Sequence, residues 1–67
     1  MLLDKVSGKD FTFTVWRSST HFEFRAYKEG ELVKCFEFAP GDSDRHDNQI
    51  IKKGKQVIRD WARLRRH

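Results

Sequence analysis

Five basic side chains recur at helical spacing in the last third of the chain. They are separated by three, four, four and three residues, so a helix would place them along one edge. Neighbouring like charges at this spacing repel by about 0.2–0.5 kcal/mol per pair, a cost that solubility alone does not require. Lysine and arginine bind phosphate and carboxylate groups, so the pattern predicts a surface for an anionic partner. We call these residues the basic stripe: Lys52, Lys55, Arg59, Arg63 and Arg66.

Two classes of partner fit the basic stripe, nucleic acid and an acidic protein surface. At 1.5 Å per residue the stripe extends over ~21 Å, enough to follow several phosphates. The stripe carries no paired Asn or Gln that would read base edges, so we expect backbone contacts with little sequence preference. The plain alternative is a solvated helix face whose last basic residues complement the negative end of the helix dipole.

A second candidate surface lies on the predicted sheet. Its residues fall on the face opposite the phenylalanines, and they are Trp16, His21, Arg25 and Tyr27. Exposed aromatic residues beside an arginine stack on bases or anchor a protein interface. Glu23 and Glu37 share this face and nearly balance its charge, which favours a protein partner over nucleic acid. An inhibitor or adaptor of the phage accessory type is the corresponding function, and ordinary cross-strand packing is the alternative.

Catalytic and metal-binding patterns are weak in this chain. Cys35 and His21 share a sheet face, but their pairing is diagonal and no third residue orients them. The carboxylates of residues 42–47 lack the glycine and the distal glutamate of a calcium loop, and Arg45 interrupts them. Helix capping explains these carboxylates more simply. We therefore predict a non-enzymatic protein with no catalytic residue, metal, cofactor or small-molecule substrate.

The elements that position these residues follow from hydrophobic periodicity. Residues 11–17 and 20–27 alternate strictly, which is typical of antiparallel strands with one buried face. A tight turn at Ser18-Ser19 would pair Val15 with Phe22. A three-residue loop, 28–30, would pair Phe22 with Phe36, whereas a two-residue loop would oppose Phe22 to a glutamate. In this register all six phenylalanines lie on one face, with Lys34 at its margin.

A helix is predicted from about Asp44 to Arg66. Asp42, Ser43 and Asp44 offer N-cap oxygens, and Asp44 with Asp47 resembles a capping box. Gly54 lies in the middle of the apolar face, which includes Leu64 and is expected on the far side of the helix from the basic stripe. A glycine at this position indicates close approach to a Phe ring of the sheet, or a kink.

These elements predict an α+β fold over residues 1–67: a three-stranded antiparallel β-meander packed against one C-terminal helix. Residues 1–10 leave two alternatives, a fourth edge strand or a short cap over the core. The net charge of +4 belongs to the helix, because residues 46–67 hold seven basic and two acidic residues. Cys35 is alone, and the N-terminus lacks the apolar run of a signal peptide, so we expect a cytoplasmic protein. No stretch is apolar enough to span a membrane.

Overall fold

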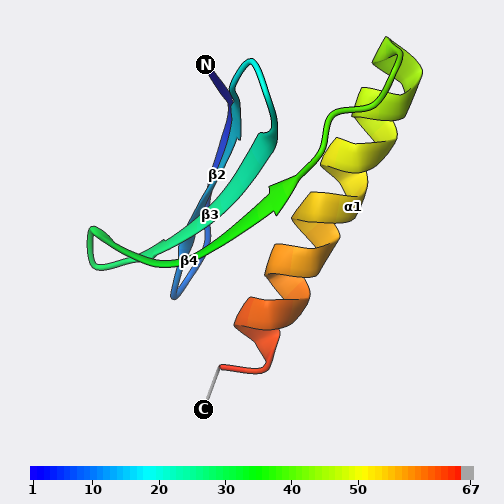
Figure 1. The fold of residues 1–67 in the computed structure, drawn as a ribbon. Coiled ribbons are helices and arrows are strands. Elements are labelled where there is room, and N and C mark those ends of the chain that lie inside the picture. Colours follow the sequence, from blue (N-terminus) through cyan, green and yellow to red (C-terminus); the bar gives the residue numbers. More distant parts are fainter. Residues whose placement is uncertain (66–67) are drawn as a thin grey trace.

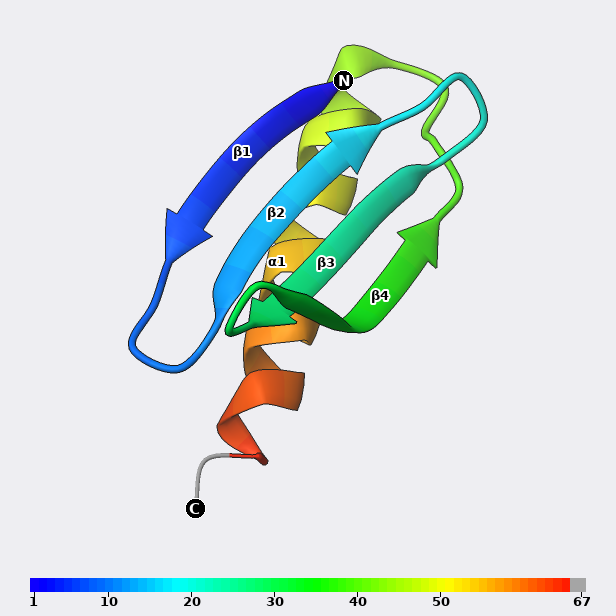
Figure 2. The ribbon, with the colours of Figure 1, turned by 90° about the vertical axis from the view of Figure 1, so that its left-hand side faces the viewer.

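The computed structural model describes residues 1–65 of the 67-residue chain. Four strands form an antiparallel sheet in the order β1-β2-β3-β4, and one helix packs on one of its faces (Figure 1, Figure 2). This is the predicted α+β fold, with the N-terminal residues forming the fourth edge strand. The elements are β1 (Leu2–Ser7), β2 (Thr12–Arg17), β3 (Phe22–Lys28), β4 (Glu31–Phe38) and α1 (Asp44–Arg63).

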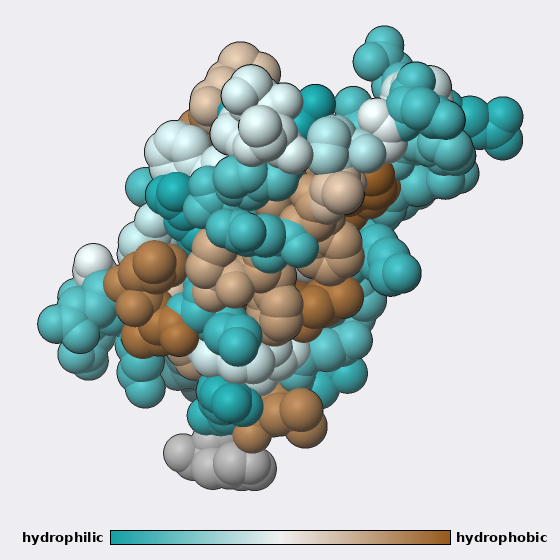
Figure 3. Space-filling model, in the orientation of Figure 1, coloured by the Kyte–Doolittle hydropathy of each residue, from teal (hydrophilic) through white to brown (hydrophobic). Residues whose placement is uncertain are grey.

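The core lies between the sheet and α1 and is built mainly from phenylalanines. Phe11, Phe22 and Phe24 are buried, and the other three phenylalanines pack against them. Burial of aromatic side chains is the main apolar contribution that a chain of this length can make. Figure 3 shows apolar surface lying between the sheet and the helix on one side of the molecule. The prediction that all six phenylalanines serve one core is confirmed.

The β2–β3 hairpin has a different register from the predicted one. Val15 lies opposite Phe24, not Phe22, because the loop spans residues 18–21 instead of two serines. The Ser18 amide donates to the His21 carbonyl at 3.0 Å and closes this longer loop. A shift of two residues keeps every side chain on its predicted face. It also places Arg17 opposite Phe22, with the guanidinium 4.7 Å from the ring centroid.

The β3–β4 hairpin closes through two residues, so the predicted three-residue loop is wrong. Glu29 and Gly30 both have positive φ, 53° and 83°, as a two-residue turn of type I′ requires. A β-bulge follows, in which Val33 is the extra residue of β4. Because Val33 adds one residue to β4, the phenylalanines of β3 and β4 lie opposite one another on the same face. Phe24 pairs with Phe36, and Phe22 pairs with Phe38.

Helix α1 begins after Ser43, whose hydroxyl accepts a hydrogen bond from the His46 amide at 3.2 Å. The predicted Asp44–Asp47 capping box is wrong, because the Asp47 carboxylate accepts instead from the Gly41 amide at 2.8 Å. The bond from Gly41 ties the loop before the helix to its first turn. The helix ends at Arg63 and not at the predicted Arg66.

The buried edge of α1 consists of Gly54, Ile58 and Ala62. A Cβ added at Gly54 would overlap the Phe24 ring, which confirms the predicted close approach to the sheet. Leu64 was expected on the apolar face, but its side chain is 72% exposed. Between residues 1 and 65, no helix is long and apolar enough to span a membrane.

Candidate anion-binding site

Three residues of the basic stripe directly follow the three buried residues of α1. Lys55, Arg59 and Arg63 come after Gly54, Ile58 and Ala62. Successive helical residues are about 100° apart, so the stripe borders the buried edge and does not point away from the sheet. The expectation that the cationic and apolar faces are opposite is therefore wrong. The helix is rotated so that the stripe lies on the side of α1 that faces β1, where Lys55 and Arg59 both lie near Asp4.

Strand β1 is the part of the sheet that α1 leaves uncovered. The helix packs against β2, β3 and β4, while Leu3 and Val6 of β1 remain partly exposed. A solvent-open hollow of about 300 Å³ lies where β1 and β2 face the C-terminal half of α1. We call it the β1–α1 groove, and it is lined by Val6, Gly8, Phe13, Arg59, Ala62 and Arg63.

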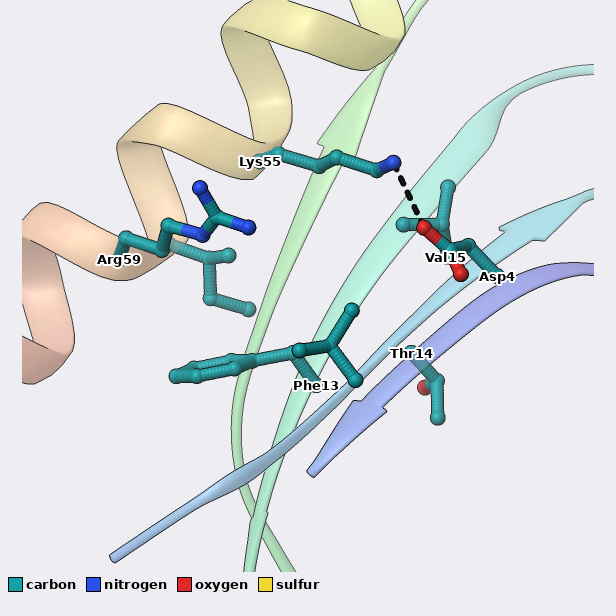
Figure 4. A pocket seen from close by; sticks show the side chains of 8 residues that line it. Asp4, Phe13, Thr14, Val15, Lys55 and Arg59 are labelled. Carbon is teal, nitrogen blue, oxygen red and sulfur yellow. Dashed lines mark hydrogen bonds and ion pairs between the residues drawn. The ribbon is translucent and has the colours of Figure 1, made fainter. Parts of the chain in front are cut away.

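An ion pair lies beside this groove, in a neighbouring pocket that Val6, Phe13 and Arg59 also line. The Lys55 ammonium donates to the Asp4 carboxylate at 2.6 Å and so connects α1 to β1 (Figure 4). The Lys55 hydrogen bond, followed by the Lys5 backbone amide, holds the pKa of Asp4 below its ordinary range, and Arg59 adds a smaller electrostatic effect. Lys55 is thus engaged within the protein and is not a free contact of the stripe.

The remaining stripe residues differ in how available they are. Lys52, Arg59 and Arg63 are exposed, and Arg59 makes no direct ion pair among the described residues. Arg63 lies 3.4 Å from Asp60, but both side chains are more than half exposed, and such a pair is weak. Arg66 lies outside the described residues. An anion approaching α1 from the β1 side would therefore meet Lys52, Arg59 and Arg63 first.

The second candidate surface, on the outer face of the sheet, forms a connected network around Arg25. Its guanidinium lies 4.8 Å from the Trp16 ring centroid and donates to Glu23 at 3.1 Å and to the Tyr27 hydroxyl at 3.4 Å. The Arg25 hydrogen bond is the main cause that lowers the pKa of Glu23. The structure therefore brings three of the four predicted residues together, with the charge of Arg25 already compensated.

His21, the fourth predicted residue, lies at the end of the sheet. It was expected opposite Trp16, but the hairpin register places Glu23 there. The His21 ring lies 3.2 Å from Glu23 and 3.8 Å from Glu37, a grouping with the donor types that metal ions use. Arg25 already donates to the Glu23 carboxylate, and the positive charge of the Arg25 guanidinium would repel a metal ion bound beside it. We assign no metal to these residues.

Cys35 lies on the same face, with its sulfur 3.6 Å from the Glu23 carboxylate. Burial is the main cause that raises the pKa of the Cys35 thiol, and Glu23 raises it further. A raised pKa reduces the thiolate fraction at neutral pH, which makes the thiol a poor nucleophile.

The sequence prediction missed the apolar residues of the groove, Val6 and Phe13. A signal for them exists in the sequence, because four of the five stripe residues immediately follow small or apolar residues at the same helical spacing. That pattern places a basic edge beside a buried edge, and hence beside the sheet.

No protein-family model matches the chain, and no curated protein or solved structure is significantly similar to it.

Proposed function

We propose that this is a small non-enzymatic binding protein that contacts nucleic-acid phosphates through the exposed part of the basic stripe. The observation that supports this most is the alignment of Lys52, Arg59 and Arg63 along one edge of α1. Arg59 and Arg63 are one helical turn apart, so both can approach neighbouring phosphates of one strand. The stripe carries no pair of side chains suited to reading bases, so we expect little sequence preference.

The charge distribution supports the same proposal. Residues 46–67 hold seven basic and two acidic residues, which concentrates the positive charge on the helix side. A one-sided positive field attracts polyanions and raises the association rate. A cytoplasmic location belongs to this proposal, because the single cysteine cannot form an internal disulfide.

The proposal predicts a salt-dependent, sequence-tolerant affinity. For three phosphate contacts, log affinity should fall with log salt at a slope of about −2 to −3. Charge reversal by Arg59→Glu or Arg63→Glu should weaken binding to mixed-sequence DNA and RNA about equally and reduce the slope. Mobility-shift and anisotropy titrations at several salt concentrations measure both quantities.

The matched control is Lys53→Glu, which reverses an exposed charge on the same helix but off the stripe. This variant should lose less affinity than the stripe variants, because its side chain lies on another side of α1. Equal losses for all three variants would mean that only net charge matters. Absence of binding to DNA and RNA at low salt would reject the proposal.

The alternative is a protein-binding inhibitor or adaptor. The observation that favours it is a second hollow, of about 410 Å³, on the outer face of the sheet. Leu2, Trp16 and Tyr27 contribute to its lining, and aromatic residues of this kind anchor protein interfaces. Because Arg25 is paired with Glu23, this face has little net charge to attract a polyanion.

A further inference from the structure

We propose that the β1–α1 groove holds an unpaired base of a single-stranded nucleic acid, with its flanking phosphates on Arg59 and Arg63. This inference rests on the proposed function and specifies the form of nucleic acid that the site prefers.

The floor of the groove is apolar and open. Val6 is 39% exposed on the uncovered strand β1, and Phe13 is half-buried beside it on β2. A Cβ at Gly8 would contact the Phe13 ring at 3.8 Å, so the glycine places no side chain of its own over this edge of the ring. A hollow of about 300 Å³ with an aromatic and an aliphatic side chain at its base accommodates a planar, uncharged ring.

The wall of the same groove is cationic. Arg59 and Arg63 line it together with the apolar floor, and none of its six lining residues is acidic. Two acidic side chains lie nearby: Asp4, in the neighbouring pocket, is paired with Lys55, and Asp60 makes only a weak, exposed pair with Arg63. An occupant with a planar, uncharged ring whose face can stack, and with adjacent negative charge, therefore satisfies both parts of the groove. The units of a single strand have this composition.

A duplex cannot use the floor in this way. Its base faces are stacked and paired inside the helix, so it presents mainly phosphates and groove edges to a protein. The exposed stripe would contact a duplex and a single strand alike, whereas the floor would contact only the strand. The groove thus turns a general phosphate-binding edge into a site that prefers unpaired nucleotides.

The test compares two labelled probes of matched phosphate number, an oligothymidine strand and a hairpin duplex, by fluorescence anisotropy at low salt. We expect the wild-type protein to bind the strand about tenfold more tightly, the effect of one base stacked on an aromatic side chain. Val6→Asn and Phe13→Leu should remove most of this preference and leave duplex affinity unchanged. Circular dichroism establishes that each variant is folded.

The matched control is Val33→Asn, since Val33 is similarly exposed, at 42%, on the opposite edge strand β4. It should keep the full preference for the strand. Equal affinity for strand and duplex would overturn the groove inference while leaving the phosphate-binding proposal intact. A preference that survives both groove substitutions would also overturn it. Binding of a leucine-containing acidic peptide, but not of the strand, with the same Val6 dependence would identify a protein segment as the occupant instead.

Discussion

At the scale of single residues, the structure divides the basic stripe by role. Lys55 was expected to meet a partner, but its ammonium is held by Asp4 and connects the helix to the edge strand. Arg59 and Arg63 lie further along the same edge and remain exposed. A charge that is compensated within the fold contributes little to attracting an anion. The attraction of the stripe for an anion is therefore strongest at Arg59 and Arg63, not at Lys55.

The Asp4–Lys55 pair makes a specific prediction about acid stability. The pKa of Asp4 is lowered in the folded protein from its ordinary value of 3.8, so its stabilising effect is present above that pH. The effect is lost as the pH falls through the lower, folded pKa. Asp4→Asn should therefore reduce the free energy of unfolding at pH 7, and this difference from wild type should shrink below pH 4.

Urea unfolding at pH 7, 4 and 3 measures this convergence. Glu29→Gln is the control, because Glu29 lies in the exposed turn of the β3–β4 hairpin. A difference between Asp4→Asn and wild type that stays constant down to pH 3 would contradict the role given to the pair.

At the scale of elements, one close contact sets how α1 lies on the sheet. Gly54 allows the helix backbone to reach Phe24, whose side chain is fully buried. This contact fixes which edge of α1 faces the core, and the stripe takes its direction from that rotation. The β4 bulge acts similarly within the sheet, because its extra residue decides which side chains of β4 join the core.

Gly54→Ala should destabilise the protein although alanine favours helices. The gain in helix propensity is about 1 kcal/mol. Overpacking against a buried ring costs about 1–3 kcal/mol, and the added methyl group would overlap Phe24. We expect a net loss of about 1 kcal/mol in the free energy of unfolding, measured by urea denaturation. Lys53→Ala, at the exposed neighbouring position, should change it by less than about 0.5 kcal/mol. An increase in stability for Gly54→Ala would contradict the close contact.

At the scale of the whole molecule, the two candidate surfaces lie on opposite sides of the core. The helix packs on one face of the sheet (Figure 2). The Arg25 network lies on the other face, because its residues alternate with the buried residues of β2 and β3. A partner bound in the β1–α1 groove therefore leaves the outer face free.

This separation predicts that the two surfaces respond independently to substitution. Tyr27→Ala should change nucleic-acid affinity by less than about twofold. Tyr27 lines the hollow on the outer face of the sheet, and substitutions at distant sites act independently. If the protein-binding alternative is correct, the same variant should lose a partner captured from nuclease-treated lysate, while Arg59→Glu should retain it. A large loss of nucleic-acid affinity in Tyr27→Ala would show that the surfaces are not independent.

Much of the fold could be predicted from residue periodicity. Alternation placed the six phenylalanines on one face, the 3.6-residue period placed Lys52, Lys55, Arg59 and Arg63 along one edge of α1, and Gly54 indicated contact with a Phe ring. These predictions succeeded because side-chain direction within one element depends only on local backbone geometry. The hairpin registers were wrong for two reasons that leave no periodic signal. The loop over residues 18–21 shifted the β2–β3 pairing, and the Glu29-Gly30 turn with the bulge at Val33 changed the β3–β4 pairing.

The sequence by itself determined that the phenylalanines share one face of the sheet, that Lys55, Arg59 and Arg63 share one edge of the helix, and where the positive charge is concentrated. Only the tertiary structure decided where those faces point. The rotation of α1 against the sheet, the uncovered β1 and the Asp4–Lys55 pair between residues 51 positions apart all depend on packing between elements. Periodicity contains no information about how one element is oriented against another, and the β1–α1 groove exists only through that orientation.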